Sequence, residues 1–387
     1  MPFEGNPHVK LVCISAWPMP YNTPVLNALA QHLDLHALYM SGDDRINRFV
    51  DVWGDEPTFD YSFFWSKTLH SEAIDLQAQF SLGVSRRLAK LRPDAILIRS
   101  WKPVMLEPLL WSRWSGRAAV MWAESTSFSG LMRGAASTQI RRLVVRKVDS
   151  FVSNGSQATA YLRMLGAPAG RIVTSRLPAG LTSMTSTSVV RRGRRDGVRF
   201  LYVGRLIPRK RPMELIRAFE TVRRELPDTT LTLVGGGELE PAVREAAARI
   251  PGVRYGGVCE GRELAFHYAE SDVLVLPALR EVWGLVVNEA LAHGLFVIAT
   301  DEVGSAYDLL DERSGMMLPA NDLERLAPAL IETARALDVG DVARRRRALA
   351  VSDCTPARFA SDICQAAELA LRRRGVPRHD TSDLTRS

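Results

Sequence analysis

Two glutamates, Glu281 and Glu289, stand eight residues apart on either side of Gly284. An uninterrupted apolar run, Val273–Leu276, precedes them and has the composition of a strand that is covered on both faces. Pro277 ends this strand and places Glu281 on the loop at its carboxyl end. Carboxylates accept hydrogen bonds from hydroxyl groups. The segment therefore predicts a site for a polyhydroxylated ligand.

The residues after Gly284 predict a short helix that begins at the same edge. Gly284 allows a close backbone approach, and residues 285–293 form a helix that Gly294 ends. The first amides of such a helix have no partner within it, which suits a phosphate group. Pairs of glutamates at this spacing are common among 43 acidic residues, so the inference depends on the surrounding strand, glycine and helix.

A basic turn follows another predicted strand of the same half. Gly204 and Arg205 come directly after Val203, and Lys210 follows five residues later. Arginine offers a planar fork of donors and lysine a compact charge, so the turn can clamp a diphosphate. Taken alone, the motif is also compatible with an exposed basic loop.

Length and composition predict two soluble α/β domains. The chain has 387 residues, 46% of them apolar and 24% charged, and no apolar run of about 18 residues. Residues 1–10 contain no hydrophobic signal segment. The four cysteines are scattered and lack the spacing of a disulfide framework or zinc site. We therefore expect a cytoplasmic protein without a structural metal.

The net charge of +7 comes mainly from arginine clusters. Neither interleaved aromatic residues nor a recognition motif accompanies them, which disfavours a nucleic-acid partner. Solvated helix faces explain most of these charges, and attraction to an anionic membrane or substrate remains open.

Strand and helix patterns alternate through both halves, which predicts two doubly wound, Rossmann-like domains that face a central cleft. We divide the chain into a first domain (1–180), a polar linker (181–199), a second domain (200–355), a helix that packs back on the first domain (356–375) and a flexible tail (376–387). The predicted strands are 9–15, 35–39, 95–98, 118–122, 150–153, 200–203, 231–234, 253–255, 273–276 and 296–299.

Hydride transfer is disfavoured because neither half carries a dinucleotide-binding fingerprint. The first predicted strand continues into residues 17–20, which contain no glycine. Gly235–Gly237 lacks the later glycine at the required spacing, and no Walker sequence occurs.

Residues 200–322 resemble the sugar-nucleotide domain of the family-4 retaining glycosyltransferases, which have the GT-B fold. The matching segments are 203–206 with Lys210, 234–239, 257–277, 277–290 and 294–300. The resemblance implies a nucleotide-diphosphate sugar of the UDP or GDP type as co-substrate. Because cationic side chains can neutralise the diphosphate and no Asp-x-Asp motif stands at the end of a predicted strand, we expect no other cofactor and no metal. It also implies that the donor sugar keeps its anomeric configuration.

Site roles follow from the same resemblance. It implies that Arg205 and Lys210, on the turn that Gly204 opens, hold the diphosphate. Glu281 would bind hydroxyls of the transferred sugar, and Glu289 those of the ribose. The backbone amides of Gly284, Leu285 and Val286 would meet the phosphates, and the segment around Val258 the base. Fixed cations and amide dipoles suit a departing diphosphate, because they stabilise its developing charge.

The first half departs from the family pattern. Residues 17–22 stand where the family often has a glycine-rich turn, and Glu124 lies where many members have a histidine. Glu124 is our candidate to orient or deprotonate the acceptor hydroxyl; an exposed loop acid is the alternative. In the second half, Ser305 replaces a usual glycine after Gly304.

Other functions remain open from the sequence. A glycosidase also uses paired carboxylates but has no use for a phosphate clamp. A sugar-nucleotide epimerase, a phosphorylase, or a catalytically silent sugar-nucleotide-binding or assembly protein shares the architecture. The acceptor is a saccharide, a lipid-linked or a natural-product molecule. Residues 137–148 predict a helix whose apolar face (Ile140, Leu143, Val144 and Val148) packs on the core and whose arginines allow peripheral contact with the inner membrane face.

Overall fold

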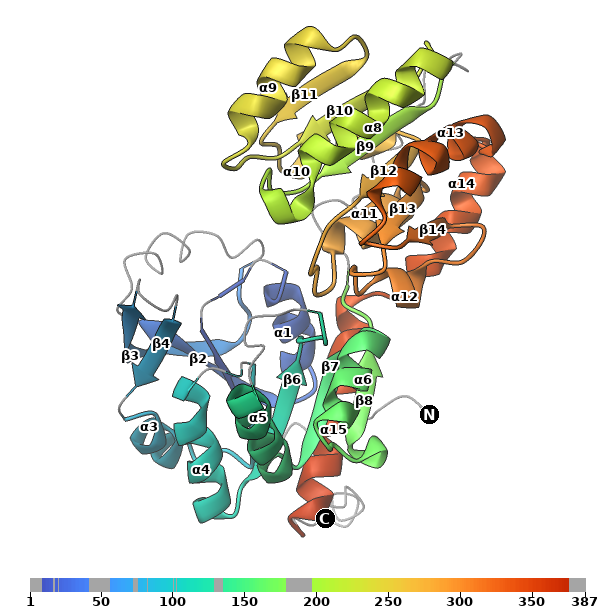
Figure 1. Cartoon of the computed structure of the whole chain (residues 1–387). Coiled ribbons are helices and arrows are strands. Elements are labelled where there is room, and N and C mark those ends of the chain that lie inside the picture. Colours follow the sequence, from blue (N-terminus) through green and yellow to red (C-terminus); the bar gives the residue numbers. More distant parts are fainter. Residues whose placement is uncertain are drawn as a thin grey trace.

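The computed structural model describes residues 9–16, 18–19, 21–41, 56–71, 76–81, 83–99, 101, 103–128, 135–178 and 197–375. These residues form two α/β domains, each built on its own sheet (Figure 1). Most of the predicted linker and all of the predicted tail lie outside the described residues.

The first domain contains an eight-stranded sheet in the order β4-β3-β2-β1-β5-β6-β7-β8. Every neighbouring pair is parallel except β3 and β4, which are antiparallel. Its strands are β1 (Lys10–Ser15), β2 (Asp34–Ser41), β3 (Asp60–Ser71), β4 (Leu76–Ser81), β5 (Ala95–Ile98), β6 (Ala118–Ala123), β7 (Ser150–Asn154) and β8 (Ile172–Ser175).

The second domain contains a six-stranded parallel sheet in the order β11-β10-β9-β12-β13-β14. Its strands are β9 (Arg199–Val203), β10 (Thr230–Val234), β11 (Val253–Gly257), β12 (Val273–Leu276), β13 (Phe296–Thr300) and β14 (Gly315–Leu318).

Helices cover both faces of each sheet, which confirms the doubly wound architecture. The α-helices are α1 (Thr23–Ala30), α3 (Val84–Leu91), α4 (Leu106–Ser115), α5 (Ala135–Lys147), α6 (Gly155–Met164), α8 (Pro212–Glu225), α9 (Glu240–Arg249), α10 (Gly261–Ala269), α11 (Leu285–Ala292), α12 (Ala306–Leu309), α13 (Leu326–Ala336), α14 (Asp341–Ala348) and α15 (Pro356–Arg373). In the first domain, α1 and α15 cover one face, and α3, α4, α5 and α6 cover the other.

The central strands β5 and β12 match their predicted bounds, because both are short, fully buried apolar runs. The sequence did not predict β3, β4, β8 or β14. Each of these elements includes polar or exposed positions: Tyr61 and Trp65 of β3 and Met317 of β14 are exposed. A strand at the margin of a sheet is less completely covered, so its apolar pattern is weaker.

The C-terminal helix α15 packs on the first domain, although it follows the second domain in the chain (Figure 1). The Phe359 ring lies 4.7 Å from that of Trp122 in β6. Ser175 donates a hydrogen bond of 2.7 Å to Asp362, and Ser150 donates one to the Ala366 carbonyl. The chain therefore crosses between the domains twice.

The orientation of α5 differs from the sequence prediction. Ile140 and Leu143 of the predicted apolar face are exposed, whereas Val148 of that face is buried. Val145, which was not placed on that face, is buried as well. The predicted apolar face was therefore wrong in part. α5 has apolar residues on two sides, and the position of β7 decides which side faces the core.

Candidate active site

The loops after β9 and β10 are joined by backbone hydrogen bonds. The Gly204 amide donates to the Val234 carbonyl at 3.0 Å, and the Leu206 amide donates to the Gly236 carbonyl at 2.9 Å. A Cβ atom on Gly235 would lie 2.0 Å from the Gly204 carbonyl oxygen. Glycine is therefore required where these loops meet, and the contact fixes the path of the basic turn.

The basic turn leads Lys210 to Glu281. Lys210 ends a short 3-10 helix, Pro208–Lys210, and its ammonium group forms an ion pair with the Glu281 carboxylate. The Leu279 amide donates to the Arg209 carbonyl at 2.7 Å and so ties the loop after β12 to this turn. The structure thus brings together two residues, 71 positions apart in sequence, that the sequence analysis assigned to one ligand.

Three arginines accompany the Lys210–Glu281 pair: Arg205 and Arg209 lie close to Lys210, and Arg280 lies close to Arg209. Arg209 and Arg280 were not predicted. Arg205 is exposed, Arg209 and Lys210 are half-buried, and Arg280 is exposed beside them. Burial, with the charges of Arg209 and Arg205, lowers the pKa of Lys210 to about 7. Burial and the charges of Arg205 and Arg280 likewise lower the pKa of Arg209. Two carboxylates belong to the same cluster, those of Glu281 and of Glu302, which accepts the Arg280 amide at 2.9 Å. The four cations still outnumber them, and this excess of positive charge favours a polyanionic ligand.

The Glu281 loop is held by a second loop that follows β13. The Glu281 amide donates to the Glu302 carbonyl at 2.9 Å, and the Gly304 amide donates to the Glu281 carbonyl at 3.0 Å. A Cβ atom on Gly304 would lie 2.1 Å from the Val282 carbonyl oxygen. Ser305, which replaces a glycine of the family pattern, is buried and donates from its amide to the Trp283 carbonyl. The serine therefore fits within this loop pair.

Helix α11 begins directly after the Glu281 loop. Gly284 takes a left-handed conformation (φ 92°), and an added Cβ would lie 3.2 Å from the Glu281 side chain. The first turn contains Leu285 and Val286, whose amides point out of the helix start by the geometry of any α-helix. The amide donors and the Lys210–Glu281 pair therefore lie at the same sheet edge.

Glu289 lies in the second turn of α11 and is half-buried. The Tyr268 hydroxyl donates to its Oε2 atom at 2.7 Å, and the Tyr268 ring stacks on His293 at 5.2 Å. Burial raises the pKa of Glu289 to about 6, although the Tyr268 hydrogen bond opposes this shift. Tyr268 was not among the predicted residues, because it lies on α10, a helix whose position only the fold determines.

Val258 lies beyond β11 and is 68% exposed. A Cβ atom on Gly236 would lie 2.8 Å from a Val258 methyl group, so Val258 packs on the glycine loop that supports the basic turn. The structure therefore places Val258 at the same edge of the second sheet as Gly204.

The first domain contributes a separate polar cluster at its own carboxyl edge. Glu124 follows β6 and accepts a bond of 2.8 Å from Arg99, which follows β5. Arg99 also donates to the Asn22 side chain at 3.1 Å and lies 3.8 Å from the centre of the Trp122 ring. Arg99 was not among the predicted site residues. Its position directly after a buried strand, like that of Glu124, is the signal that would have identified it.

The carboxyl edges of the two sheets meet at one junction. Asp308 of α12 accepts two hydrogen bonds from the Ser156 amide and one from its hydroxyl, at 2.9 to 3.1 Å. Asn288, the neighbour of Glu289, donates to the Leu177 carbonyl at 2.8 Å and accepts from the Trp283 indole at 2.9 Å. The residues that surround Glu281 and Glu289 therefore also join the domains.

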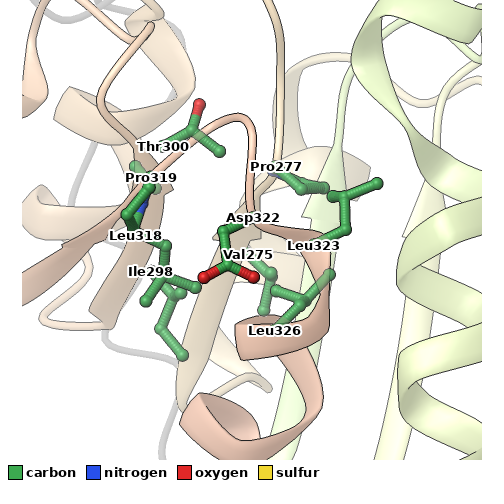
Figure 2. A pocket seen from close by; sticks show the side chains of 10 residues that line it. Val275, Pro277, Ile298, Thr300, Leu318, Pro319, Asp322, Leu323 and Leu326 are labelled. Carbon is green, nitrogen blue, oxygen red and sulfur yellow. The ribbon is translucent and has the colours of Figure 1, made fainter.

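A small cavity lies within the second domain, beside Pro277 and Thr300, and Asp322 points into it (Figure 2). Its volume is about 10 Å³, which is about the space of a single water molecule. This cavity is therefore too small for a nucleotide or a sugar. Among the described residues, no three His, Cys, Asp or Glu side chains are grouped to hold a metal ion; the predicted absence of a metal stays a prediction.

Comparisons with known proteins show that the chain is similar to glycosyltransferases in sequence and in fold. Residues 197–335 match the family model of glycosyl transferases group 1. The chain is 27% identical over 264 residues to a glycogen synthase of Mycobacterium tuberculosis, a match that covers 63% of this chain and 62% of that protein. It is 32% identical over 161 residues to a GDP-mannose-dependent α-(1-6)-phosphatidylinositol monomannoside mannosyltransferase of Mycolicibacterium smegmatis, over 38% of this chain and 42% of that protein.

Solved structures share the whole fold. A glycosyltransferase from Rickettsia africae superposes with a TM-score of 0.69 at 12% identity, over 93% of this chain and 98% of that one. Anabaena HepE, solved in complex with UDP and glucose, gives a TM-score of 0.61 at 14% identity, over 95% and 99% of the two chains. The two Rossmann-like domains thus have the GT-B architecture.

Proposed function

We propose that this protein is a glycosyltransferase that moves a sugar from a nucleotide-diphosphate donor to a hydroxyl group of an acceptor. The observation that carries the proposal is the excess of cations around the Lys210–Glu281 pair, at the start of α11. A site with carboxylates and a larger number of cations suits a ligand that has a polyhydroxylated part next to a diphosphate.

In this proposal, the diphosphate occupies the cationic region. Arg205 and Lys210 bind it, together with the amides of Gly284, Leu285 and Val286, and its approach breaks the Lys210–Glu281 ion pair. Glu281 then accepts hydroxyls of the transferred sugar, which orients the ring and favours positive charge at the anomeric carbon. These groups stabilise the charge that develops on the departing diphosphate.

The nucleoside occupies the other side of α11. Glu289 accepts the ribose hydroxyls, with Tyr268 holding one of its oxygens, and the exposed segment around Val258 contacts the base. Both UDP and GDP donors are compatible with this arrangement. The mannosyltransferase relative is named for a GDP-mannose donor, and HepE binds UDP, so the two matches point to different bases.

The transfer step takes place between the two sheets. The bond from the anomeric carbon to the diphosphate oxygen breaks, and its electron pair leaves with the diphosphate. The acceptor oxygen bonds to the anomeric carbon, and its proton passes to Glu124. We assign the chain to the family-4 enzymes and expect retention of configuration without a divalent metal, because fixed cations already neutralise the leaving group. Product stereochemistry, measured by proton NMR, tests the retention.

The acceptor belongs to the saccharides, lipid-linked saccharides or natural products. No helix in the described ranges combines the length and apolar composition that a bilayer-spanning segment needs. We propose a peripheral contact with anionic lipid through the α4–α5 face, which we define by its exposed apolar residues: Leu106, Leu110, Trp114, Ile140 and Leu143.

Two observations favour a membrane as the occupant of the α4–α5 face. The helices α4 and α5 are neighbours on one side of the first sheet (Figure 1). Trp114 is 88% exposed, and the exposed cations Arg142, Arg146 and Lys147 lie on α5 beside the apolar residues. Apolar side chains next to cations fit the interface of an anionic bilayer.

A donor screen tests the proposed function. The protein is incubated with UDP- and GDP-sugars and a panel of acceptors, and the released nucleotide is identified by mass spectrometry. We expect acceptor-dependent release of one nucleotide by the wild type and none by Lys210→Ala. Donor binding without release under any acceptor would favour the catalytically silent binding or assembly protein. Interconversion of the nucleotide sugar itself would favour an epimerase.

A further inference from the structure

The carboxyl edge of the first sheet carries a polar cluster on three neighbouring strands. Arg99 follows β5, Glu124 follows β6, and Asn22 lies between β1 and α1. Because β1, β5 and β6 are adjacent in the sheet, their loops lie side by side. The edge at which parallel strands end is where open α/β sheets bind ligands. The cluster therefore occupies the position of an acceptor site.

The Arg99 guanidinium is buried and held in one orientation. Its side chain is only 6% exposed, and it stacks 3.8 Å above the Trp122 ring. One nitrogen, Nη2, donates to Asn22 at 3.1 Å and to Glu124 at 2.8 Å. Burial of a charge costs free energy unless a partner compensates it, so a buried arginine at a ligand edge indicates a specific use.

The cluster keeps hydrogen-bonding groups unused. Arg99 engages the Oε1 atom of Glu124, whose side chain is 35% exposed, and no bond within the described part of the chain engages Oε2. The Arg99 Nε atom and the Asn22 Nδ2 atom are buried and have no partner among the described residues. One free acceptor beside two free donors matches the needs of a ligand with several hydroxyl groups.

We propose that Arg99 is a positioning residue: it fixes Glu124 through one oxygen so that the second oxygen receives the attacking hydroxyl of a polyhydroxylated acceptor. Asn22 and Trp122 hold Arg99 in place for this task. The inference rests on the proposed glycosyltransferase function. The role of Arg99 concerns the acceptor alone. Substitutions in this cluster should therefore slow transfer and leave donor binding unchanged.

A double-mutant cycle between Arg99→Gln and Glu124→Gln tests the proposal. We expect each single variant to lower kcat/KM for the acceptor by about 100-fold, since a small misplacement of a reacting group has that effect. The double variant should be no slower than the slower single variant, because Arg99 acts through Glu124. The Kd of the donor, measured by calorimetry, should stay within about twofold of the wild type.

Two further variants separate positioning from folding. Arg99→Lys keeps the buried charge but cannot hold Asn22 and Glu124 with one planar group, so we expect an intermediate loss of about tenfold. If Arg99→Gln is unfolded by circular dichroism, Arg99→Lys takes its place in the cycle. Arg117→Gln breaks the ion pair with Asp94 at the opposite edge of the same two strands and should keep wild-type activity.

The proposal would be overturned if the losses in kcat/KM of the two single variants multiplied in the double variant. It would also be overturned if donor affinity fell by the same factor as kcat/KM. An Arg99→Gln enzyme that transfers sugar at the wild-type rate while Lys210→Ala does not would likewise overturn it, and in that case the proposed function would stand. A wild type that releases no nucleotide with any acceptor would instead overturn the proposed function, and this inference with it.

Discussion

The carboxylate of Asp308, in the second domain, caps the first turn of a helix in the first domain by accepting the amide and hydroxyl of Ser156. Gly155 allows this approach: it takes φ 76°, and an added Cβ would lie 2.5 Å from Asp308 and 2.4 Å from Trp283. Trp283 belongs to the loop that carries Glu281. The contact between the domains and the proposed donor site therefore share one loop.

Asp308→Ala should loosen the junction between the domains. Loss of a capping acceptor costs about 1 kcal/mol, and here the cost falls on the contact between the domains. We expect a larger radius of gyration by small-angle X-ray scattering and faster proteolysis between the domains. Asp311→Ala is the matched control, because Asp311 accepts the amides of Arg313 and Ser314 within its own domain. Equal effects of both variants would contradict the role of Asp308.

Lys210→Ala and Arg205→Ala should each reduce transfer by about 100-fold or more, since each removes a cation from the departing diphosphate. Both variants should fold, because neither side chain contributes to the apolar core. Steady-state kinetics and donor titration give the measurement. Lys90→Ala, which removes an exposed lysine of α3, is the control. Unchanged turnover and donor affinity in either clamp variant would refute its assignment to the diphosphate.

Donor affinity should fall as the pH decreases below about 6. Burial raises the pKa of Glu289 from 4.5 to about 6, and we expect the ionised carboxylate to bind the ribose hydroxyls more strongly than the protonated form. For this group alone, the free energy of unfolding decreases as pH rises from about 4.5 to about 6, because the folded state binds the proton more tightly. Protonation therefore stabilises the fold and weakens the complex.

Calorimetric titration between pH 5 and 8 checks this effect. An intact nucleotide sugar is the ligand to use, because its diphosphate lacks the terminal phosphate group that titrates near pH 6. Glu289→Gln should bind more weakly at pH 7 and should lack the decrease in affinity below about pH 6. Above pH 7 both proteins should lose affinity, because Lys210, whose pKa is lowered to about 7, loses its charge there. If the wild type and Glu289→Gln had the same pH profile, Glu289 would not contact the ribose.

Transfer should continue in EDTA at the rate measured without it. The proposed site neutralises the diphosphate with Arg205, Lys210 and helix amides, so a divalent ion has no required place. Initial rates in EDTA, magnesium and manganese provide the comparison. Activity that EDTA removes and magnesium or manganese restores would show that a metal takes part.

Binding to anionic vesicles should depend on the α4–α5 face. Each basic residue near such a surface contributes about 1 kcal/mol, so replacing Arg142 and Arg146 by glutamine should weaken binding about 30-fold at low salt. Trp114→Ser should weaken it at high salt as well. Co-sedimentation with phosphatidylglycerol and phosphatidylcholine vesicles gives the measurement. The control replaces Arg345 and Arg346, which lie on α14 of the second domain. If the wild type stayed in the supernatant at low salt, the contact would be excluded.

The sequence by itself determined the central strands and the residues at their carboxyl ends. β5 and β12 could be predicted because continuous apolar runs bounded by polar residues or proline have few other structures open to them. Arg205, Glu281 and Glu124 could be placed at sheet edges because each follows such a run. These are local properties, and neighbouring residues alone decide them.

Only the tertiary structure decided which of these residues meet. The ion pair of Lys210 with Glu281, the contact of Tyr268 with Glu289 and the burial of Arg99 beside Glu124 all join separate loops or helices. Strand order and helix packing set the distances between these residues. The sequence around each residue does not indicate which distant residue it will contact. The same reason explains α5, where apolar residues occur on two sides and the position of the sheet selects the buried one.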